Sequence, residues 1–262
     1  MDRFLGSNPA AVIANLRSRA PRWFAEAEAI AGYASSLLMR IDVHEGNVQE
    51  LLASLLFQRI VAGFEAVLLL AERGMHTQGL VQRRSVLEAL FVLGAIVHDS
   101  DYVGRFLAAD ETRVLEIYKK IKRLPLSVRE ALEPEFTLSL IEAKITEFKS
   151  RTGGRKGPSA ADYAKAAGLE TYYLTDYAFA SEAAHSVAKD LERHIALNAE
   201  GDVDGMRWGP EDVPASALLM HAMDYALMAC FAVQRLFGIG LEAELNDLRA
   251  RLNQFMESAV AG

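Results

Sequence analysis

The chain has 262 residues, of which 51% are hydrophobic and 24% charged, and its net charge is −7. This composition excludes an intrinsically disordered chain, and the length is enough to bury one large core or two small ones. A single cysteine, Cys230, excludes a disulfide framework, and Met1 to Leu16 lack the pattern of a secretory signal peptide. We therefore expect a globular protein of the cytoplasm.

Apolar residues recur at spacings of three and four along the chain, whereas strict alternation never persists, so the pattern predicts helices and no strand. Residue types that cap or open helices mark the starts. They are Asn8 with Pro9, Pro21, Asn47 with Glu50, Ser127 with Glu130, Pro134, and Ser159 with Asp162. We expect about nine or ten helices in a single all-α domain over residues 1–262, folded as a multi-helix bundle.

Segment 77–98 (TQGLVQRRSVLEALFVLGAIVH) is apolar nearly all round, which predicts a central, buried helix. Arg84 and Glu88 lie one turn apart on this helix and share a face with apolar residues. Such a pair has to be satisfied internally, because an unpaired buried charge costs about 3–5 kcal/mol. The pair either fixes helix register or belongs to a functional site. Arg83 is rotated by about 100° from Arg84, and we predict it on the surface.

Basic residues are concentrated in the middle of the chain. Residues 113–129 contain six basic residues and one acidic residue, and residues 144–156 contain five and one. From residue 176 to the end there are fourteen acidic and six basic residues. The middle therefore offers a candidate patch for a polyanion, while residues 119–123 also fit the solvated C-terminal end of one helix.

Two stretches rich in glycine and charge are predicted as loops, 149–158 (KSRTGGRKGP) and 198–214 (NAEGDVDGMRWGPEDVP). The first carries Arg151, Arg155 and Lys156, which we expect to contact the backbone of a nucleic acid.

The apolar segment 215–233 contains His221 and Asp224 near its middle. A helix facing lipid would insert these groups at a high cost, so we predict a core helix with His221 and Asp224 as an internal polar pair. We therefore expect no association with a membrane.

Segment 171–197 predicts one long helix with an apolar stripe. Ser181 and His185 are neighbours one turn apart at the edge of that stripe, and Tyr177 lies one turn earlier. Such a pair fits either a hydrogen-bonded structural role or a catalytic one. Glu182 and His185 form one Glu-x-x-His unit, but a di-iron site needs two such units and further carboxylates. We therefore expect no metal and no cofactor.

The run GLVQRRSVLEALFVLGAIVHD carries Arg84 and Glu88, and DYAKAAGLETYYLTDYAFASEAAHS, roughly eighty residues later, carries Ser181 and His185. Together they resemble the bacterial domain-of-unknown-function family 5677. That family reads approximately A-x-x-L-x-R-S-x-x-E-A on one helix and then Y-x-x-Y-x-x-x-S-x-x-x-H. The resemblance covers residues of about 65–198 and implies a shared architecture rather than an activity.

The chain is more distantly similar to the HEPN helical domains, many of which are ribonucleases that act as dimers in toxin and antiviral systems. The similarity implies a HEPN-like core with extra N- and C-terminal helices, and a homodimer. HEPN ribonucleases carry an arginine and a histidine four to six residues apart on one helix, and no arginine precedes His185 at that spacing. A composite site therefore requires Arg84 to meet His185 from another helix, with Glu88 orienting one of them.

The functional hypothesis is metal-independent RNA cleavage. His185 exchanges a proton with the 2′-hydroxyl or the leaving oxygen, and Arg84 balances the charge on the phosphate. Ser181 orients the imidazole or contacts the phosphate, and Tyr177 donates a hydrogen bond. The alternative is a non-catalytic scaffold, in which Arg84, Glu88, Ser181 and His185 form a buried network that fixes a helix crossing and the surface binds a protein partner. Solvent access to Arg84 and His185 separates the two hypotheses.

Overall fold

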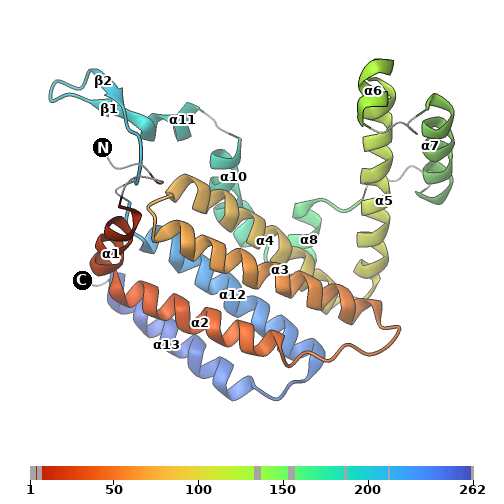
Figure 1. Ribbon diagram of the computed structural model, residues 1–262. Helices are drawn as coiled ribbons and strands as arrows, with labels where there is room; N and C mark the ends of the chain where they lie inside the picture. Colours follow the sequence, from red (N-terminus) through yellow and green to blue (C-terminus); the bar gives the residue numbers. More distant parts are fainter. Residues whose placement is uncertain are drawn as a thin grey trace.

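The computed structural model describes residue 4 and residues 8–132, 137–152, 157–185, 188–211 and 213–260. These residues form a bundle of α-helices with a short two-stranded sheet at one end (Figure 1). The predicted all-α multi-helix bundle is therefore confirmed.

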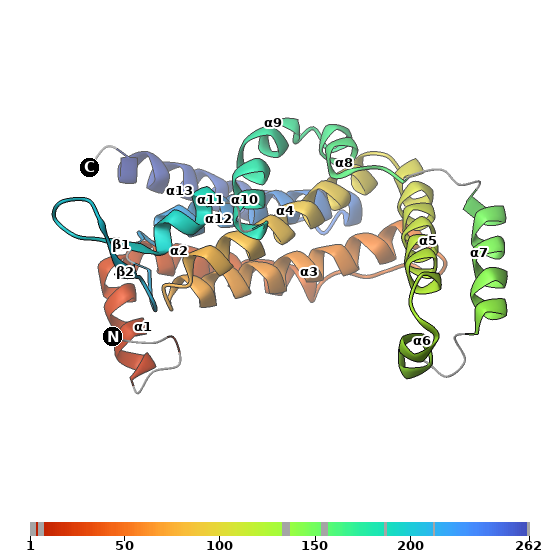
Figure 2. The ribbon, with the colours of Figure 1, turned by 90° about the horizontal axis from the view of Figure 1, so that it is seen from above.

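Long helices that lie side by side make the bundle (Figures 1 and 2). They are α2 (Pro21–Leu38), α3 (Val48–Ala71), α4 (His76–His98), α12 (Ser216–Phe237) and α13 (Glu242–Val260). Helices α3 and α4 pack along each other, and α12 packs against both. The core between them contains large side chains from several helices, namely Phe24, Phe57, Phe64, Phe91 and Tyr225.

The helix starts predicted at Asn8, Pro21, Asn47 and Ser159 are confirmed, because such signals act locally. The start predicted at Ser127 is displaced, since the helix there already begins at Leu126. The side chain of Asn47 accepts a hydrogen bond from the Glu50 backbone N–H at 3.1 Å and opens α3. Ser159 and Asp162 form the predicted capping box of α8 (Ala160–Ala166). Pro134 lies outside the described residues.

Two glycines let α4 approach its neighbours closely. A Cβ atom at Gly63 of α3 would stand 2.6 Å from Val86 Cγ2 on α4. A Cβ atom at Gly79 of α4 would stand 2.6 Å from Leu218 Cδ1 on α12. Both distances are shorter than carbon atoms tolerate, so a larger residue at either position would require the Val86 or the Leu218 side chain to shift.

Three helices project from one end of the bundle as an arm (Figures 1 and 2). They are α5 (Asp101–Lys122), α6 (Leu126–Leu132) and α7 (Leu138–Thr152), and α7 packs along α5.

The basic run 119–123 is the C-terminal end of α5, as one of its two interpretations predicts. Two of its side chains are paired on the arm, Lys119 with Glu116 at 2.6 Å and Lys122 with Glu142 at 2.8 Å. These ion pairs reduce the positive charge that the run offers to a polyanion.

At the other end of the bundle, near α1 (Pro9–Arg19), the chain forms a hairpin (Figure 1). Strand β1 (Ile195–Leu197) pairs with β2 (Val203–Met206) in an antiparallel register. The prediction of no strand and of a loop over 198–214 is therefore wrong at this point. Strands this short show no alternation, and their pairing is a contact that periodicity does not reveal.

The single helix predicted over 171–197 is correct only as far as Ala184. The backbone is helical without a break through α9 (Glu170–Tyr172), a π-helical turn (Tyr173–Tyr177) and α10 (Ala178–Ala184). Beyond it, the described residues form the short α11 (Ala188–Leu191) and a 3-10 turn (Glu192–His194) that leads into β1.

Helices α3 and α12 are long and apolar enough to cross a membrane, by length and composition alone. In the bundle, 44% of the most apolar window of α3 and 56% of that of α12 are buried inside the protein. Segment 215–233 is therefore part of a core helix, as predicted.

Candidate functional site

Arg84, in the middle of α4, is bound by side chains from the π-helical turn and from α10. Its Nε donates to Ser181 Oγ at 2.9 Å, and its Nη2 donates to Tyr177 Oη at 2.5 Å. Nη2 also lies 3.0 Å from Glu88 Oε1, one turn along α4. The guanidinium stacks over the Tyr177 ring at 4.6 Å from its centroid, a cation–π contact. The structure thus brings together four of the predicted site residues, Arg84, Glu88, Tyr177 and Ser181, which we name the Arg84 cluster.

Tyr177 connects the carboxylate of this cluster to the guanidinium. Its hydroxyl donates to Glu88 Oε1 at 2.6 Å and accepts from Arg84. Burial raises the pKa of Tyr177 to about 12, with Glu88 adding to the rise and Arg84 opposing it. The phenol therefore keeps its proton at neutral pH. The cluster remains open to solvent, because 23% of the Arg84 side chain and 39% of the Glu88 side chain are exposed.

The prediction that Arg83 lies on the surface is wrong, since only 4% of the residue is exposed. Its Nη2 donates to Asp176 Oδ1 at 2.7 Å, and its Nη1 donates to the Ala217 carbonyl at 2.7 Å. Burial lowers the pKa of Arg83, and Asp176 opposes this effect. Because α4 contacts α3, α10 and α12, a rotation of about 100° from Arg84 reaches the core instead of solvent.

Asp176 and Tyr177 are the last two residues of the π-helical turn, and they bind the consecutive arginines Arg83 and Arg84. Asp176 is only 8% exposed, whereas Tyr177 lies at the edge of the core. Asp176 was not among the predicted site residues. Its position three residues after Tyr173 and four before Ala180 puts a lone carboxylate on their helix face, which was a signal that could have identified it.

Asp176 also faces α12, where His221 Nδ1 lies 3.7 Å from Asp176 Oδ2. Burial lowers the pKa of His221, and Asp176 opposes this effect. The predicted partner of His221, Asp224, is engaged elsewhere. It accepts from the Tyr172 hydroxyl at 2.6 Å and forms an ion pair with Arg249.

His185 follows the last residue of α10, and its side chain is exposed. Its backbone N–H donates to the carbonyls of Ser181 and Glu182. Arg84, Glu88 and His185 all lie within the described residues. Arg84 and Glu88 bond to Tyr177 and to each other, and Arg84 also bonds to Ser181. Neither bonds to the His185 imidazole. The structure therefore shows no contact between Arg84 and His185, and their meeting in one composite site stays a prediction.

The predicted basic loop does not reach the Arg84 cluster where the structure describes it. Arg151 lies in the last turn of α7, where it forms ion pairs with Glu147 at 3.1 Å and with Glu111. Helix α7 is on the far side of the projecting arm from α10 (Figure 1). Arg155 and Lys156 lie outside the described residues.

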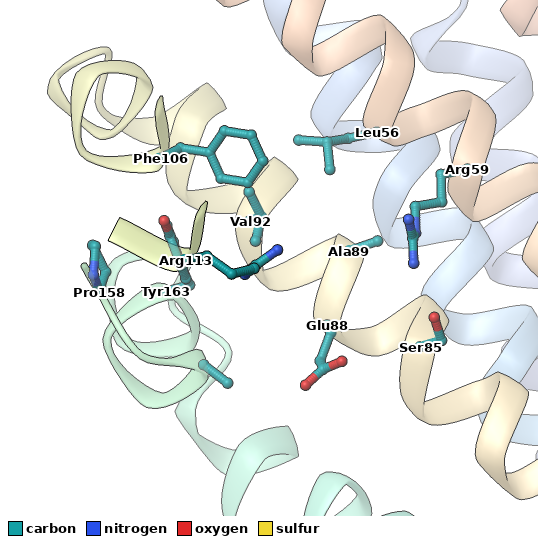
Figure 3. A pocket seen from close by; sticks show the side chains of 11 residues that line it. Leu56, Arg59, Ser85, Glu88, Ala89, Val92, Phe106, Arg113, Pro158 and Tyr163 are labelled. Atoms are coloured by element: carbon teal, nitrogen blue, oxygen red, sulfur yellow. The ribbon is translucent and has the colours of Figure 1, made fainter. Parts of the chain in front are cut away.

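A pocket of about 310 Å³ lies between α3, α4, α5 and α8, and Glu88 belongs to both this pocket and the Arg84 cluster (Figure 3). Arg59 and Arg113 enter it from opposite sides, and Ser85 and Glu88 of α4 also line it. The rest of the wall is mainly apolar and consists of Leu56, Ala89, Val92, Phe106, Pro158, Ala160 and Tyr163. Sequence analysis missed this pocket because its residues come from separate elements and form no motif.

The sequence was also compared with known proteins. The sequence model of the family of unknown function DUF5677 matches residues 50–203, more than half of the chain. The match extends beyond the predicted limits of 65–198 on both sides and includes the whole Arg84 cluster and both arginines of the pocket. No curated protein and no solved structure matches the chain. The family match shows that this chain belongs to the DUF5677 family.

Proposed function

We propose that the Arg84 cluster is a metal-independent site for RNA cleavage. One observation carries the proposal: Ser181, Tyr177 and Glu88 fix the Arg84 guanidinium while part of its side chain stays exposed. A guanidinium held in place before the reaction stabilises the charge that develops on a phosphate without reorganising during the reaction.

The proposed reaction uses the 2′-hydroxyl of the RNA as nucleophile. The 2′-oxygen attacks the adjacent phosphorus while a base accepts its proton. The bond between phosphorus and the 5′-oxygen breaks, and an acid protonates that oxygen, which leaves a 2′,3′-cyclic phosphate and a 5′-hydroxyl. We assign the base to Glu88, whose carboxylate is partly exposed and lines the pocket, and the acid to His185, which is exposed one turn beyond Ser181.

These steps require no metal ion. Among the residues that the structure describes, no three His, Cys, Asp or Glu side chains are grouped so as to hold one. The HEPN-like relationship, the homodimer and a role in toxin or antiviral systems stay predictions. A molar mass from light scattering tests the homodimer.

Incubation of single-stranded RNA with the purified chain in EDTA tests the proposal. We expect cleavage to a cyclic phosphate, reduced about 100-fold or more in Arg84→Ala and His185→Ala. His98→Ala, an exposed histidine at the end of α4, is the matched control and keeps full activity. Intact RNA with the wild-type chain, or equal cleavage by all variants, contradicts the proposal.

A second candidate function is the scaffold, and the same hydrogen bonds favour it. The bonds of the Arg84 guanidinium run to Tyr177, Ser181 and Glu88, as expected of a cross-link between α4 and α10. A scaffold predicts that Arg84→Ala destabilises the protein while the wild-type chain leaves RNA intact.

A further inference from the structure

We infer that the pocket between α3, α4, α5 and α8 binds one nucleotide, with its phosphate on Arg59 and Arg113 and its base against the apolar wall. The inference deepens the proposed function and rests on it for the source of that nucleotide, a unit of an RNA strand. Glu88 belongs to both the pocket and the Arg84 cluster, so a nucleotide bound here has its sugar and phosphate next to the proposed base.

The two arginines of the pocket are available to a ligand. Arg59 forms no hydrogen bond or ion pair with any residue that the structure describes. Within the same ranges, Arg113 approaches one carboxylate, that of Asp110 at 3.9 Å, and 76% of its side chain is exposed. Arg83 and Arg84, in contrast, have protein partners at hydrogen-bond distance. A free guanidinium offers paired N–H donors that match the oxygens of a phosphate.

The charge balance of the pocket favours an anion. Glu88 is the carboxylate among the lining residues, and its charge is offset by Arg84 at 3.0 Å. Among the described residues, Arg59 has no ionic partner and Arg113 has only Asp110 at 3.9 Å, so the pocket keeps positive charge that suits the one or two negative charges of a phosphate group.

A buried hydroxyl without a partner provides an independent sign of a ligand. Tyr163 is 6% exposed and lines the pocket, and its hydroxyl has no hydrogen-bond partner among the residues that the structure describes. Burial raises the pKa of Tyr163, and Arg113 opposes this rise. A buried hydroxyl left unpaired is unfavourable, and in the proposed complex a shift of the Tyr163 ring lets the hydroxyl donate to an oxygen of the nucleotide.

The shape and the wall fit the rest of a nucleotide. The volume of about 310 Å³ falls at the lower end of the range for small-molecule sites. Phe106 and Tyr163 form an aromatic pair with ring centroids 6.5 Å apart, and Leu56 and Val92 complete the apolar side. Aromatic and apolar side chains of this kind are the surfaces on which bases stack.

Isothermal titration calorimetry on the full chain at low salt tests the inference without requiring cleavage. The probes are adenosine 5′-monophosphate, adenosine, and a five-nucleotide DNA strand. The strand offers the same kinds of phosphate and base as RNA but has no 2′-hydroxyl. We expect the monophosphate or the strand to bind at least about tenfold more tightly than adenosine. Binding of the monophosphate identifies a site that also takes free nucleotides, and binding of the strand alone identifies a unit of a polymer.

Charge variants locate the site. Arg59→Gln and Arg113→Gln should each weaken binding by about tenfold or more. Arg40→Gln removes an exposed arginine at the end of α2 and should leave binding unchanged. If no probe binds, or if these variants bind as the wild-type chain does, the inference is wrong.

A pair of tyrosine variants tests the role of the unpaired hydroxyl. Tyr225, which is fully buried in the core, also has a hydroxyl without a partner in the described part of the chain but is not among the residues that line the pocket. Tyr163→Phe should weaken binding several-fold, whereas Tyr225→Phe should leave binding unchanged; both should preserve or raise the thermal midpoint. Equal binding by the two variants contradicts the role of Tyr163.

The outcome is separable from that of the proposed function. Nucleotide binding without RNA cleavage supports this inference and refutes the catalytic proposal. If RNA cleavage persists in Arg59→Gln and Arg113→Gln, that result supports the catalytic proposal and refutes this inference.

Discussion

Arg83 and Arg84 are consecutive on α4 but occupy opposite environments. Arg83 is 4% exposed and paired with the buried Asp176, while 23% of the Arg84 side chain remains exposed beside Glu88. A buried pair matters mainly through the cost of breaking it, because either charge alone is poorly solvated. A partly exposed guanidinium keeps the ability to meet an anion from solvent. Neighbouring residues of the same type thus serve the fold in one case and the candidate site in the other.

The largest expected effect comes from breaking the buried pair. Asp176→Asn leaves the Arg83 charge uncompensated in the core and should lower the free energy of unfolding by about 3–5 kcal/mol. Urea unfolding measures this change. Adding Arg83→Met to the same chain should restore part of the loss, because it removes the stranded charge. A loss below about 1 kcal/mol in Asp176→Asn would show that the pair does not hold the π-helical turn against α4.

The Arg84 cluster should contribute less to stability. Arg84→Met removes hydrogen bonds to Ser181 and Tyr177 in a site that water reaches, so we expect a loss of about 1–3 kcal/mol in the same urea experiment. The contrast between Arg83 and Arg84 is tested by which variant, Asp176→Asn or Arg84→Met, loses more stability. A larger loss for Arg84→Met than for Asp176→Asn would reverse the roles of the two arginines.

Tyr177→Phe should cost still less, about 0.5–1.5 kcal/mol, because a single hydroxyl is removed. The variant also has a pH signature. The pKa of Tyr177 rises from 10.0 to about 12 on folding, so its contribution to stability is present below pH 10 and is lost as the pH rises towards 12. A difference absorbance titration of wild type against Tyr177→Phe should therefore show one phenol that titrates above the normal range. A phenol titrating near 10 would refute the hydrogen bond to Glu88.

The smallest effect concerns His221, which faces Asp176 from α12. Burial lowers its pKa below the ordinary 6.5, so its contribution to stability is present above that pH and is lost as the pH falls through the lowered value. We expect His221→Gln to lose less stability than the wild-type chain between pH 7 and pH 5, as measured by thermal midpoints. An NMR titration that finds a raised pKa for His221 would mean that Asp176 outweighs burial.

Local signals in the sequence predicted much of the fold. Asn47 and Ser159 cap their helices because a cap depends on residues only three positions away. Helix α4 spans His76–His98, against the predicted 77–98, because its apolar residues extend over its whole length. The sequence analysis also placed Arg84 and Ser181 in one candidate site, and in the structure Arg84 Nε donates a hydrogen bond to Ser181 Oγ.

Features that depend on tertiary contacts were not predictable from periodicity. Arg83 is buried because α4 has neighbours on several sides, and its partner Asp176 lies 93 residues away in the chain, so no local pattern joins them. The pocket combines Arg59 from α3 with Arg113 from α5, and no spacing in the sequence joins these residues.

The most direct test of the candidate site is a crystal structure of the chain with a short RNA whose 2′-hydroxyls are replaced by hydrogen. The account predicts a phosphate within hydrogen-bond distance of Arg59 or Arg113, and the adjacent sugar next to Glu88 and the Arg84 guanidinium. A strand bound only to the basic arm of α5 and α7, with the pocket and the cluster unchanged, would contradict it.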